Sequence, residues 1–146
     1  MKRIRTTARL DHPPERVWDI LADFDRYAEW NPLNIQARGE ARLGARIPMT
    51  FLNLAKPGGG SVIRQTVRLV ACERGRSLAW AGNVPLLFRG RHHFELEPDG
   101  EGTVLCHGED LAGLIPAGFS EAQIARDFVP AYEAVNQALA QRLAAL

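Results

Sequence analysis

The segment that decides the fold spans residues 88–111 and has the sequence FRGRHHFELEPDGEGTVLCHGEDL. It contains two runs of alternating apolar and polar side chains, separated by Pro98-Asp99-Gly100-Glu101. Alternation with a period of two is typical of β-strands with one buried face, and an Asp-Gly pair between two such runs is a strong hairpin signal. We therefore expect two long antiparallel strands joined by a tight turn.

The turn sets which residues of the two strands lie opposite each other. A two-residue tip at Asp99-Gly100 places His92 opposite His107. The same register places Glu109 opposite Gly90, which has no side chain. One face of the hairpin is then mostly apolar and should be buried, and His92, His107 and Glu109 point into that interior. The other face is mostly charged and should face solvent: Arg89, Arg91, His93, Glu95 and Glu97.

The cluster of His92, His107 and Glu109 has several interpretations. Buried polar groups usually satisfy one another, so the three residues can form a purely structural network. In a cavity they would orient a mostly apolar ligand, because pockets combine apolar walls with a few placed polar groups. They are also candidate catalytic residues, as a His/Glu acid–base pair, or ligands of a metal. Because no residues that would orient metal ligands can be identified, we expect neither a metal nor another cofactor.

The segments before the hairpin predict further strands and two short helices. Residues 3–10 alternate as a strand with one exposed face does. Asp11-His12-Pro13-Pro14 ends this strand and begins a helix that reaches Ala22, and a shorter helical turn follows at residues 25–30. Glycine, proline and asparagine turns then separate four strands, which we expect near residues 35–43, 46–55, 61–73 and 77–84.

The C-terminal segment predicts one long amphipathic helix. Ser120 and Gln123 have the spacing of a capping box at its start. Beyond them apolar residues recur at helical spacing, and Pro130 should kink or split the helix. The apolar stripe consists of Ile124, Phe128, Tyr132, Val135, Leu139 and Leu143.

Together these elements predict a single domain, residues 1–146, of the α+β class. A sheet of about seven strands must cover the long terminal helix, with two short helices after the first strand. A curved sheet packed on a helix usually leaves a cavity between the two, and that cavity is the first place to look for function. The candidate wall residues, for each of which core packing is the alternative, are Trp30, Phe51, Trp80, Phe94, Leu105, Phe128 and Tyr132.

The composition excludes several classes of partner. The chain has 146 residues, 18 of them Lys or Arg and 17 Asp or Glu, so its net charge of +1 gives no reason to expect nucleic acid or an anionic membrane. The arginine rows on the outer strand faces lack the interleaved aromatic residues that stack RNA bases. No apolar stretch is long enough to span a bilayer, so we expect no stable membrane insertion.

Two features favour a cytoplasmic location. The only cysteines are Cys72 and Cys106, which lack a metal-binding or redox spacing and suit reduced thiols. The basic residues 1–7 lead into a strand pattern and not into an apolar run, so we expect no signal peptide. Nothing in the sequence indicates the oligomeric state.

The chain resembles the START-related SRPBCC superfamily along almost its whole length. The resemblance begins with LDHPPERVWDILADF at residues 10–24, followed by Tyr27 and Trp30-Asn31-Pro32. It continues through Leu78-Ala79-Trp80, Phe94-Glu95-Leu96-Glu97, Gly102-Thr103 and Val135-Asn136-Gln137-Ala138-Leu139.

This resemblance implies a helix-grip fold, in which the curved antiparallel sheet wraps around the C-terminal helix and encloses a hydrophobic cavity. The short chain and its segment at residues 23–32 are most similar to small bacterial members described as polyketide cyclase/dehydrase. Such descriptions follow the fold and do not establish an activity. The resemblance offers no shared catalytic motif that can be placed on residues of this chain.

We therefore expect a protein that binds a small hydrophobic ligand, aromatic, polyketide or lipid-like, with His92, His107 and Glu109 orienting it. The alternative is an enzyme of the polyketide cyclase/aromatase type, in which a His/Glu pair moves protons during aldol closure and loss of water. A second alternative is a protein-assembly helper, which would use the outer surface and have no cavity large enough for a ligand. The sequence leaves open whether any reaction is catalysed.

Overall fold

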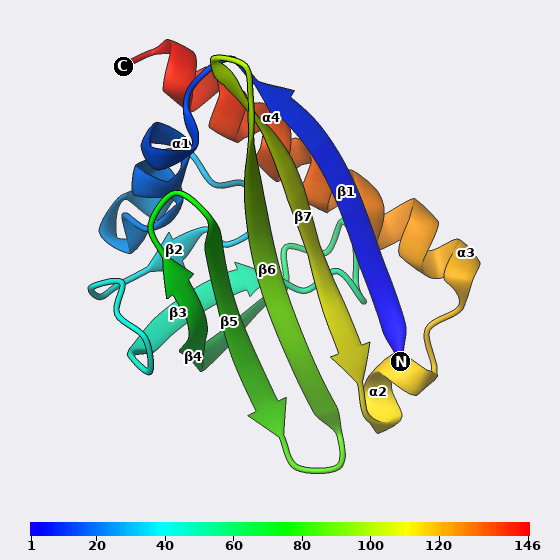
Figure 1. Ribbon diagram of the computed structural model, residues 1–146. Coiled ribbons are helices and arrows are strands. Elements are labelled where there is room, and N and C mark those ends of the chain that lie inside the picture. Colours follow the sequence, from blue (N-terminus) through cyan, green and yellow to red (C-terminus); the bar gives the residue numbers. More distant parts are fainter.

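The computed structural model describes residues 1–146 and shows one curved antiparallel sheet wrapped around a long C-terminal helix (Figure 1). The strand order is β1-β7-β6-β5-β4-β3-β2, so the first strand pairs with the last. This confirms the expected α+β, helix-grip fold class. The strands are β1 (Lys2–Leu10), β2 (Gln36–Ala37), β3 (Arg46–Leu52), β4 (Val62–Glu73), β5 (Ser77–Val84), β6 (Phe88–Asp99) and β7 (Gly102–Ala112).

Two short helices follow β1, as expected: α1 (Pro14–Leu21) and the 3₁₀ helix η1 (Phe24–Glu29). After the sheet come α2 (Leu114–Ala117) and the C-terminal helix. No helix in the structure combines the length and the apolar character needed to cross a bilayer. The C-terminal helix consists of α3 (Glu121–Gln123), the π-helical turn η2 (Ile124–Phe128) and α4 (Val129–Ala144).

The C-terminal helix passes Pro130 without breaking. Its start is capped as the sequence predicts, because the Gln123 N–H donates to Ser120 Oγ at 3.0 Å. Proline has no N–H, so the regular α-helical bond to the residue four positions earlier cannot form there. The turn before it widens instead, and the Val129 N–H bonds to the Ile124 carbonyl, five residues back.

The strand expected near residues 35–43 is reduced to Gln36–Ala37. Gly39 adopts a φ of 136°, outside the extended region. Its N–H is bonded to Asp25 Oδ1 at 3.0 Å, in the loop of η1, and not to a neighbouring strand. The chain is therefore directed out of the sheet after two paired residues.

The β6–β7 turn lies one residue later than expected. Its tip is Gly100-Glu101, flanked by the pair Asp99 and Gly102. Gly100 has a φ of 61°, the left-handed conformation that the first central position of a tight hairpin turn requires and that glycine adopts without strain. The predicted tip at Asp99-Gly100 was wrong because that turn would place the glycine at the second position.

This displacement shifts every pair of the hairpin by two residues. His92 lies opposite Glu109, and His107 lies opposite Phe94, so the predicted His92–His107 and Gly90–Glu109 pairs are wrong. An even shift keeps each side chain on its own face of the sheet. His92, His107 and Glu109 consequently still point toward the helix.

His93 was expected to face solvent, but its side chain is buried on the outer face of the sheet. Only 6% of the residue is exposed, and neither ring nitrogen has a hydrogen-bond partner. Its neighbours across the ladder are Ala79 and Gly108. These two small residues leave room for the imidazole to lie against the sheet, a detail that alternation alone does not reveal.

The burial of His93 predicts a loss of stability in acid. Burial, and next the positive charge of Arg5, lower the pKa of His93 from 6.5 to about 4. Between these values the unfolded chain binds a proton that the folded chain does not bind, so the free energy of unfolding falls as the pH falls. In urea titrations across this window, His93→Gln should show a slope shallower by up to about 1.4 kcal/mol per pH unit. Equal slopes for variant and wild type would contradict this assignment.

Candidate ligand-binding site

A cavity of about 300 Å³ lies between the sheet and the C-terminal helix. This volume is at the lower end of the range of about 300–1,000 Å³ that small-molecule sites occupy. Its walls come from the end of β3 and the loop behind it, the start of β4, the inner faces of β5, β6 and β7, and the helix positions Phe128 and Tyr132. Fifteen of its 23 lining residues are hydrophobic, so the interior favours apolar molecules.

The structure brings six of the expected site residues together around this cavity: Phe51, Trp80, His92, Glu109, Phe128 and Tyr132. Four others do not line it. Phe94, Leu105 and His107 are at most 1% exposed and belong to the solid core. Trp30 packs edge-on against Tyr27, with 5.4 Å between the ring centres, and lies outside the lining.

The division between cavity and core follows the length of the β6–β7 hairpin. Inward residues far from the turn, such as Gly90 and Leu111, line the cavity. Inward residues nearer the turn, such as Phe94 and Leu105, are covered completely. The rings of Phe94 and His107 stack at 4.2 Å in this closed half. Facing inward therefore does not by itself place a residue in the cavity.

A chain of hydrogen bonds begins on β1, away from the cavity. The Thr6 hydroxyl donates to the His107 carbonyl at 2.7 Å. Its proton is thereby committed, so the Thr6 oxygen accepts from Asn136 Nδ2 at 2.9 Å. This contact fixes the orientation of the amide, and Asn136 Oδ1 then accepts from His107 Nδ1 at 2.8 Å. His107 must carry its proton on Nδ1.

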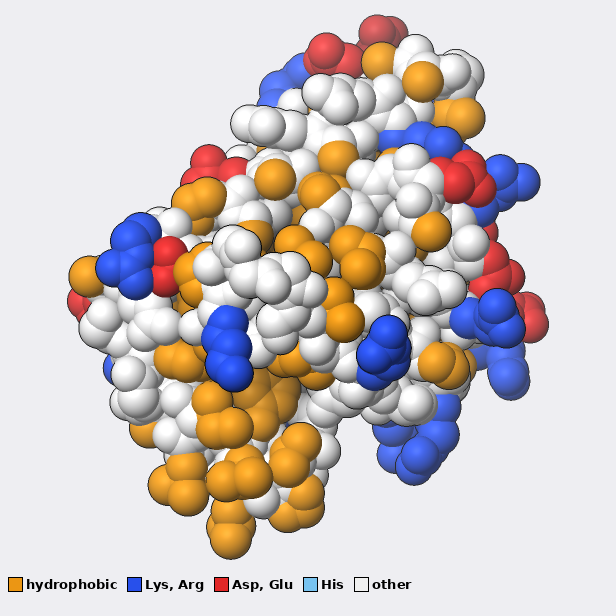
Figure 2. Space-filling view, turned by 180° about the vertical axis from the view of Figure 1, so that it is seen from behind, with side chains coloured by type: hydrophobic (Ala, Val, Ile, Leu, Met, Phe, Trp, Pro, Cys, Tyr) orange, Lys and Arg blue, Asp and Glu red, His pale blue; other side chains and the backbone are white.

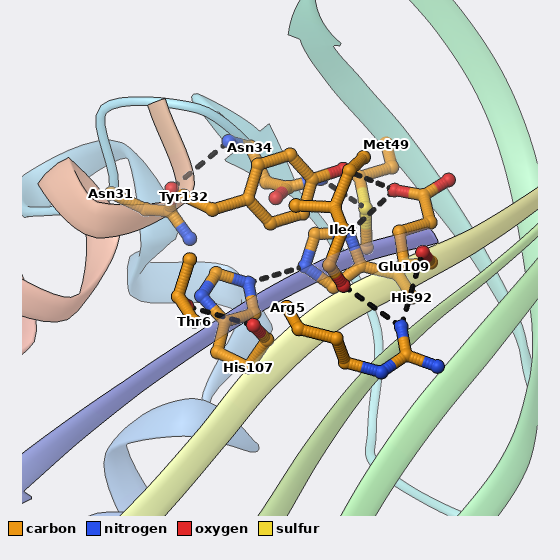
Figure 3. A network of polar contacts seen from close by, with 10 residues as sticks. All are labelled: Ile4, Arg5, Thr6, Asn31, Asn34, Met49, His92, His107, Glu109 and Tyr132. Carbon is orange, nitrogen blue, oxygen red and sulfur yellow. Dashed lines mark hydrogen bonds and ion pairs between the residues drawn. The ribbon is translucent and has the colours of Figure 1, made fainter. Parts of the chain in front are cut away.

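The chain continues from His107 to the cavity wall (Figure 3). Burial, and next the neighbouring His92, hold the pKa of His107 well below its usual value, so the ring is neutral and Nε2 is an acceptor. His92 Nε2 donates to this nitrogen at 2.7 Å. His92 Nδ1 then lies 3.1 Å from Glu109 Oε1. That contact requires one proton, which either the imidazole or the carboxyl group carries.

Tyr132 closes the chain at the cavity. Its hydroxyl donates to Glu109 Oε1, the same oxygen that faces His92. Burial, and then the charge of Glu109, raise the pKa of Tyr132 well above 10, so the phenol keeps its proton. Trp80 and Tyr132 both stack on the His92 ring, at 4.6 and 5.2 Å between ring centres, and so hold its plane.

Two glycines allow polar groups to approach the cavity floor. Gly82 and Gly90 lie opposite each other on β5 and β6. The space that a Cβ of Gly90 would occupy lies 2.6 Å from Glu109 Oε2, and a Cβ of Gly82 would lie equally close to Gln65 Oε1. Glu109 Oε2 has no hydrogen-bond partner within the protein, unlike Oε1. This oxygen is therefore available to accept a hydrogen bond from a ligand.

Sequence reasoning missed Thr6 and Asn136 as members of this network. Asn136 lies four residues after Tyr132 and eight after Phe128, so these residues share one face of the helix. A polar residue in an otherwise apolar stripe is the signal that could have identified it. The structure contains no group of three or more His, Cys, Asp or Glu side chains that could hold a metal ion.

Comparison with known proteins places this geometry in context. A family model described as "Polyketide cyclase / dehydrase and lipid transport" matches residues 1–144. No curated protein matches the sequence. A START superfamily protein from Mycobacterium smegmatis is similar in structure, with 15% identity, a TM-score of 0.78 and coverage of 98% of this chain and 97% of that one.

Two further solved structures show the same fold. Protein TTHA0849 from Thermus thermophilus has 18% identity, a TM-score of 0.77 and coverage of 99% of this chain and 98% of its own. Protein CV1439 from Chromobacterium violaceum has 20% identity and a TM-score of 0.74, with 98% of each chain covered. At these identities the likeness establishes the architecture and says nothing of the ligand.

Proposed function

Since the chain belongs to the polyketide cyclase/dehydrase and lipid transport family of the SRPBCC superfamily, we propose that it binds a small, largely apolar molecule that carries a hydrogen-bond donor. One observation carries this proposal. The cavity of about 300 Å³ is apolar except for a few polar groups, among which Glu109 lies against Tyr132 and His92.

The cavity chemistry supports a ligand with two distinct parts. Phe51, Trp80 and Phe128 offer aromatic walls, and burial of apolar surface against them would supply most of the affinity. Glu109 Oε2 would accept the ligand's hydroxyl or amine proton, since every other bond of this carboxyl group goes to the protein. An assembly helper without a cavity does not fit this arrangement.

Trp80 allows ligand binding to be located directly. It lines the cavity, whereas Trp18 does not line it and donates its Nε1–H to the Ser77 carbonyl. Titration with para-bromophenol, an apolar phenol whose bromine quenches tryptophan fluorescence, should show a saturable decrease. The decrease should disappear in Trp80→Phe and persist in Trp18→Phe. An undiminished saturable decrease in Trp80→Phe would place binding elsewhere.

The hydrogen-bond chain supports catalysis as a second candidate function. One proton is shared by His92 and Glu109, and this pair ends at the cavity wall. Such a pair can take a proton from a bound carbonyl compound and return it to another atom, as aldol closure and loss of water require. In this reading Glu109 would act as the base. His107 would act through His92 as a positioning residue, because it does not reach the cavity.

A further inference from the structure

The mouth of the cavity is surrounded by exposed apolar side chains. Ten large hydrophobic residues of the chain are exposed, and six of them lie on the three segments that frame the mouth. We call these six residues the rim: Ile63, Val84, Leu86, Leu87, Leu114 and Ile115. Figure 2 shows hydrophobic side chains gathered at the lower end of the molecule, where Figure 1 places α2 and the β5–β6 loop.

The rim is continuous with the cavity wall. Ile63, Val84 and Ile115 line the cavity and are also 38%, 44% and 50% exposed. One side of each residue therefore faces the interior and the other faces solvent. An apolar path leads from the surface to the binding space without an intervening charged side chain.

The β5–β6 loop holds Leu86 outward. Its φ of 67° is the only positive φ at a residue other than glycine in the structure, and such a conformation is uncommon for a bulky side chain. The carbonyl of Leu86 accepts from the Leu114 N–H at 3.0 Å, and that of Leu87 accepts from the Ile115 N–H at 2.9 Å. These bonds hold the loop against α2 while 86% of Leu86 stays exposed. The loop therefore presents an apolar tip in a fixed position.

The charges around the rim are all positive. The segments that frame the mouth, residues 53–65, 82–91 and 112–120, contain no Asp or Glu. They contain Lys56, Arg64, Arg89 and Arg91, and the paired β1 start adds Lys2 and Arg3. The near-neutral total of 18 basic and 17 acidic residues conceals this local excess. Figure 2 shows no acidic side chain among the hydrophobic ones at this end.

We propose that the rim docks reversibly on an anionic lipid membrane, with the cavity mouth facing the bilayer. Exposed leucines combined with flanking Lys and Arg are the two components of interfacial binding: apolar burial at the level of the headgroups and attraction to anionic lipids. A protein partner would need acidic groups and a matching apolar surface, whereas an anionic bilayer supplies both over any area. That the ligand enters through this mouth rests on the function proposed above; the docking itself does not.

The test uses the whole chain and two kinds of vesicle. Flotation should show binding to vesicles of phosphatidylcholine and phosphatidylglycerol in equal parts, weaker binding to phosphatidylcholine alone, and release by added salt. Leu86→Asn with Leu114→Gln should weaken binding at least about tenfold. Asn tolerates the positive φ, and both positions are exposed, so the variant should fold normally. Leu43→Gln is the matched control, since Leu43 is 71% exposed outside the rim.

Each outcome decides the matter separately from ligand binding. Loss of flotation in the rim variant alone, with para-bromophenol still quenching Trp80, supports the proposal. No flotation of the wild type, or equal flotation of the rim variant, overturns it even if the cavity binds ligands. A wild-type dimer in solution that the rim variant converts to a monomer also overturns it, because the rim would then be an interface between two copies.

Discussion

Replacing Asn136 by leucine should lower the free energy of unfolding by about 3 kcal/mol. Asn136 is 4% exposed and its amide bonds to both Thr6 and His107. Without Asn136 Oδ1, the His107 Nδ1–H has no acceptor in a fully buried position. A buried donor without a partner costs roughly 1–3 kcal/mol, and the lost bond to Thr6 adds to that. Urea denaturation of the two proteins measures the difference.

The neighbouring position provides a matched control. Gln137→Leu also replaces an amide by leucine on the same helix, but Gln137 is exposed and the change should stay within about 0.5 kcal/mol. If Asn136→Leu were as stable as wild type, the amide would not be what holds the network. The variant should also lose the slowly exchanging His107 Nδ1–H resonance in NMR spectra, which a general packing defect would not remove selectively.

Replacing Glu109 by glutamine should reduce the affinity for para-bromophenol between about tenfold and 150-fold. The change keeps the shape of the side chain, and its carbonyl oxygen can still accept from Tyr132. The charged oxygen that faces the ligand is lost, and with it a hydrogen bond of about 1.5–3 kcal/mol. Calorimetric titration measures this effect directly. Bromobenzene, which has the same ring without the hydroxyl group, should bind the variant and the wild type equally.

Glu121→Gln controls for the loss of a charge, because Glu121 is exposed and does not line the cavity. Equal losses of affinity for both compounds in Glu109→Gln would mean that the side chain shapes the cavity and does not bind the hydroxyl group. For a substrate that is converted, a catalytic Glu109 predicts loss of kcat at saturating substrate. A raised KM at unchanged kcat would leave Glu109 a binding residue only.

The faces of the hairpin could be predicted from sequence although its register could not. Alternation determines whether His92 points inward, and it is insensitive to a turn displaced by one residue, because the pairing then shifts by two. The partner of His92 depends on the turn conformation. That conformation was decided by the need for Gly100 at the first central position.

The composition of the site could be predicted only in part. Periodicity identified inward residues such as Trp80 and Phe94, but it carries no information on depth. Whether such a residue lines the cavity or fills the core depends on where the C-terminal helix packs along the sheet. The contact between Asn136 and Thr6 joins residues 130 positions apart, so only the assembled fold reveals it.

The central claim is that the space between sheet and helix holds a small apolar molecule. Native mass spectrometry of the protein purified from its own host without detergent tests this most directly, followed by denaturing extraction of whatever is bound. We predict one small molecule per chain, largely apolar and carrying a hydroxyl or amine group, and its absence from a Glu109→Gln preparation. A mass equal to that of the bare chain in every wild-type preparation would contradict the claim.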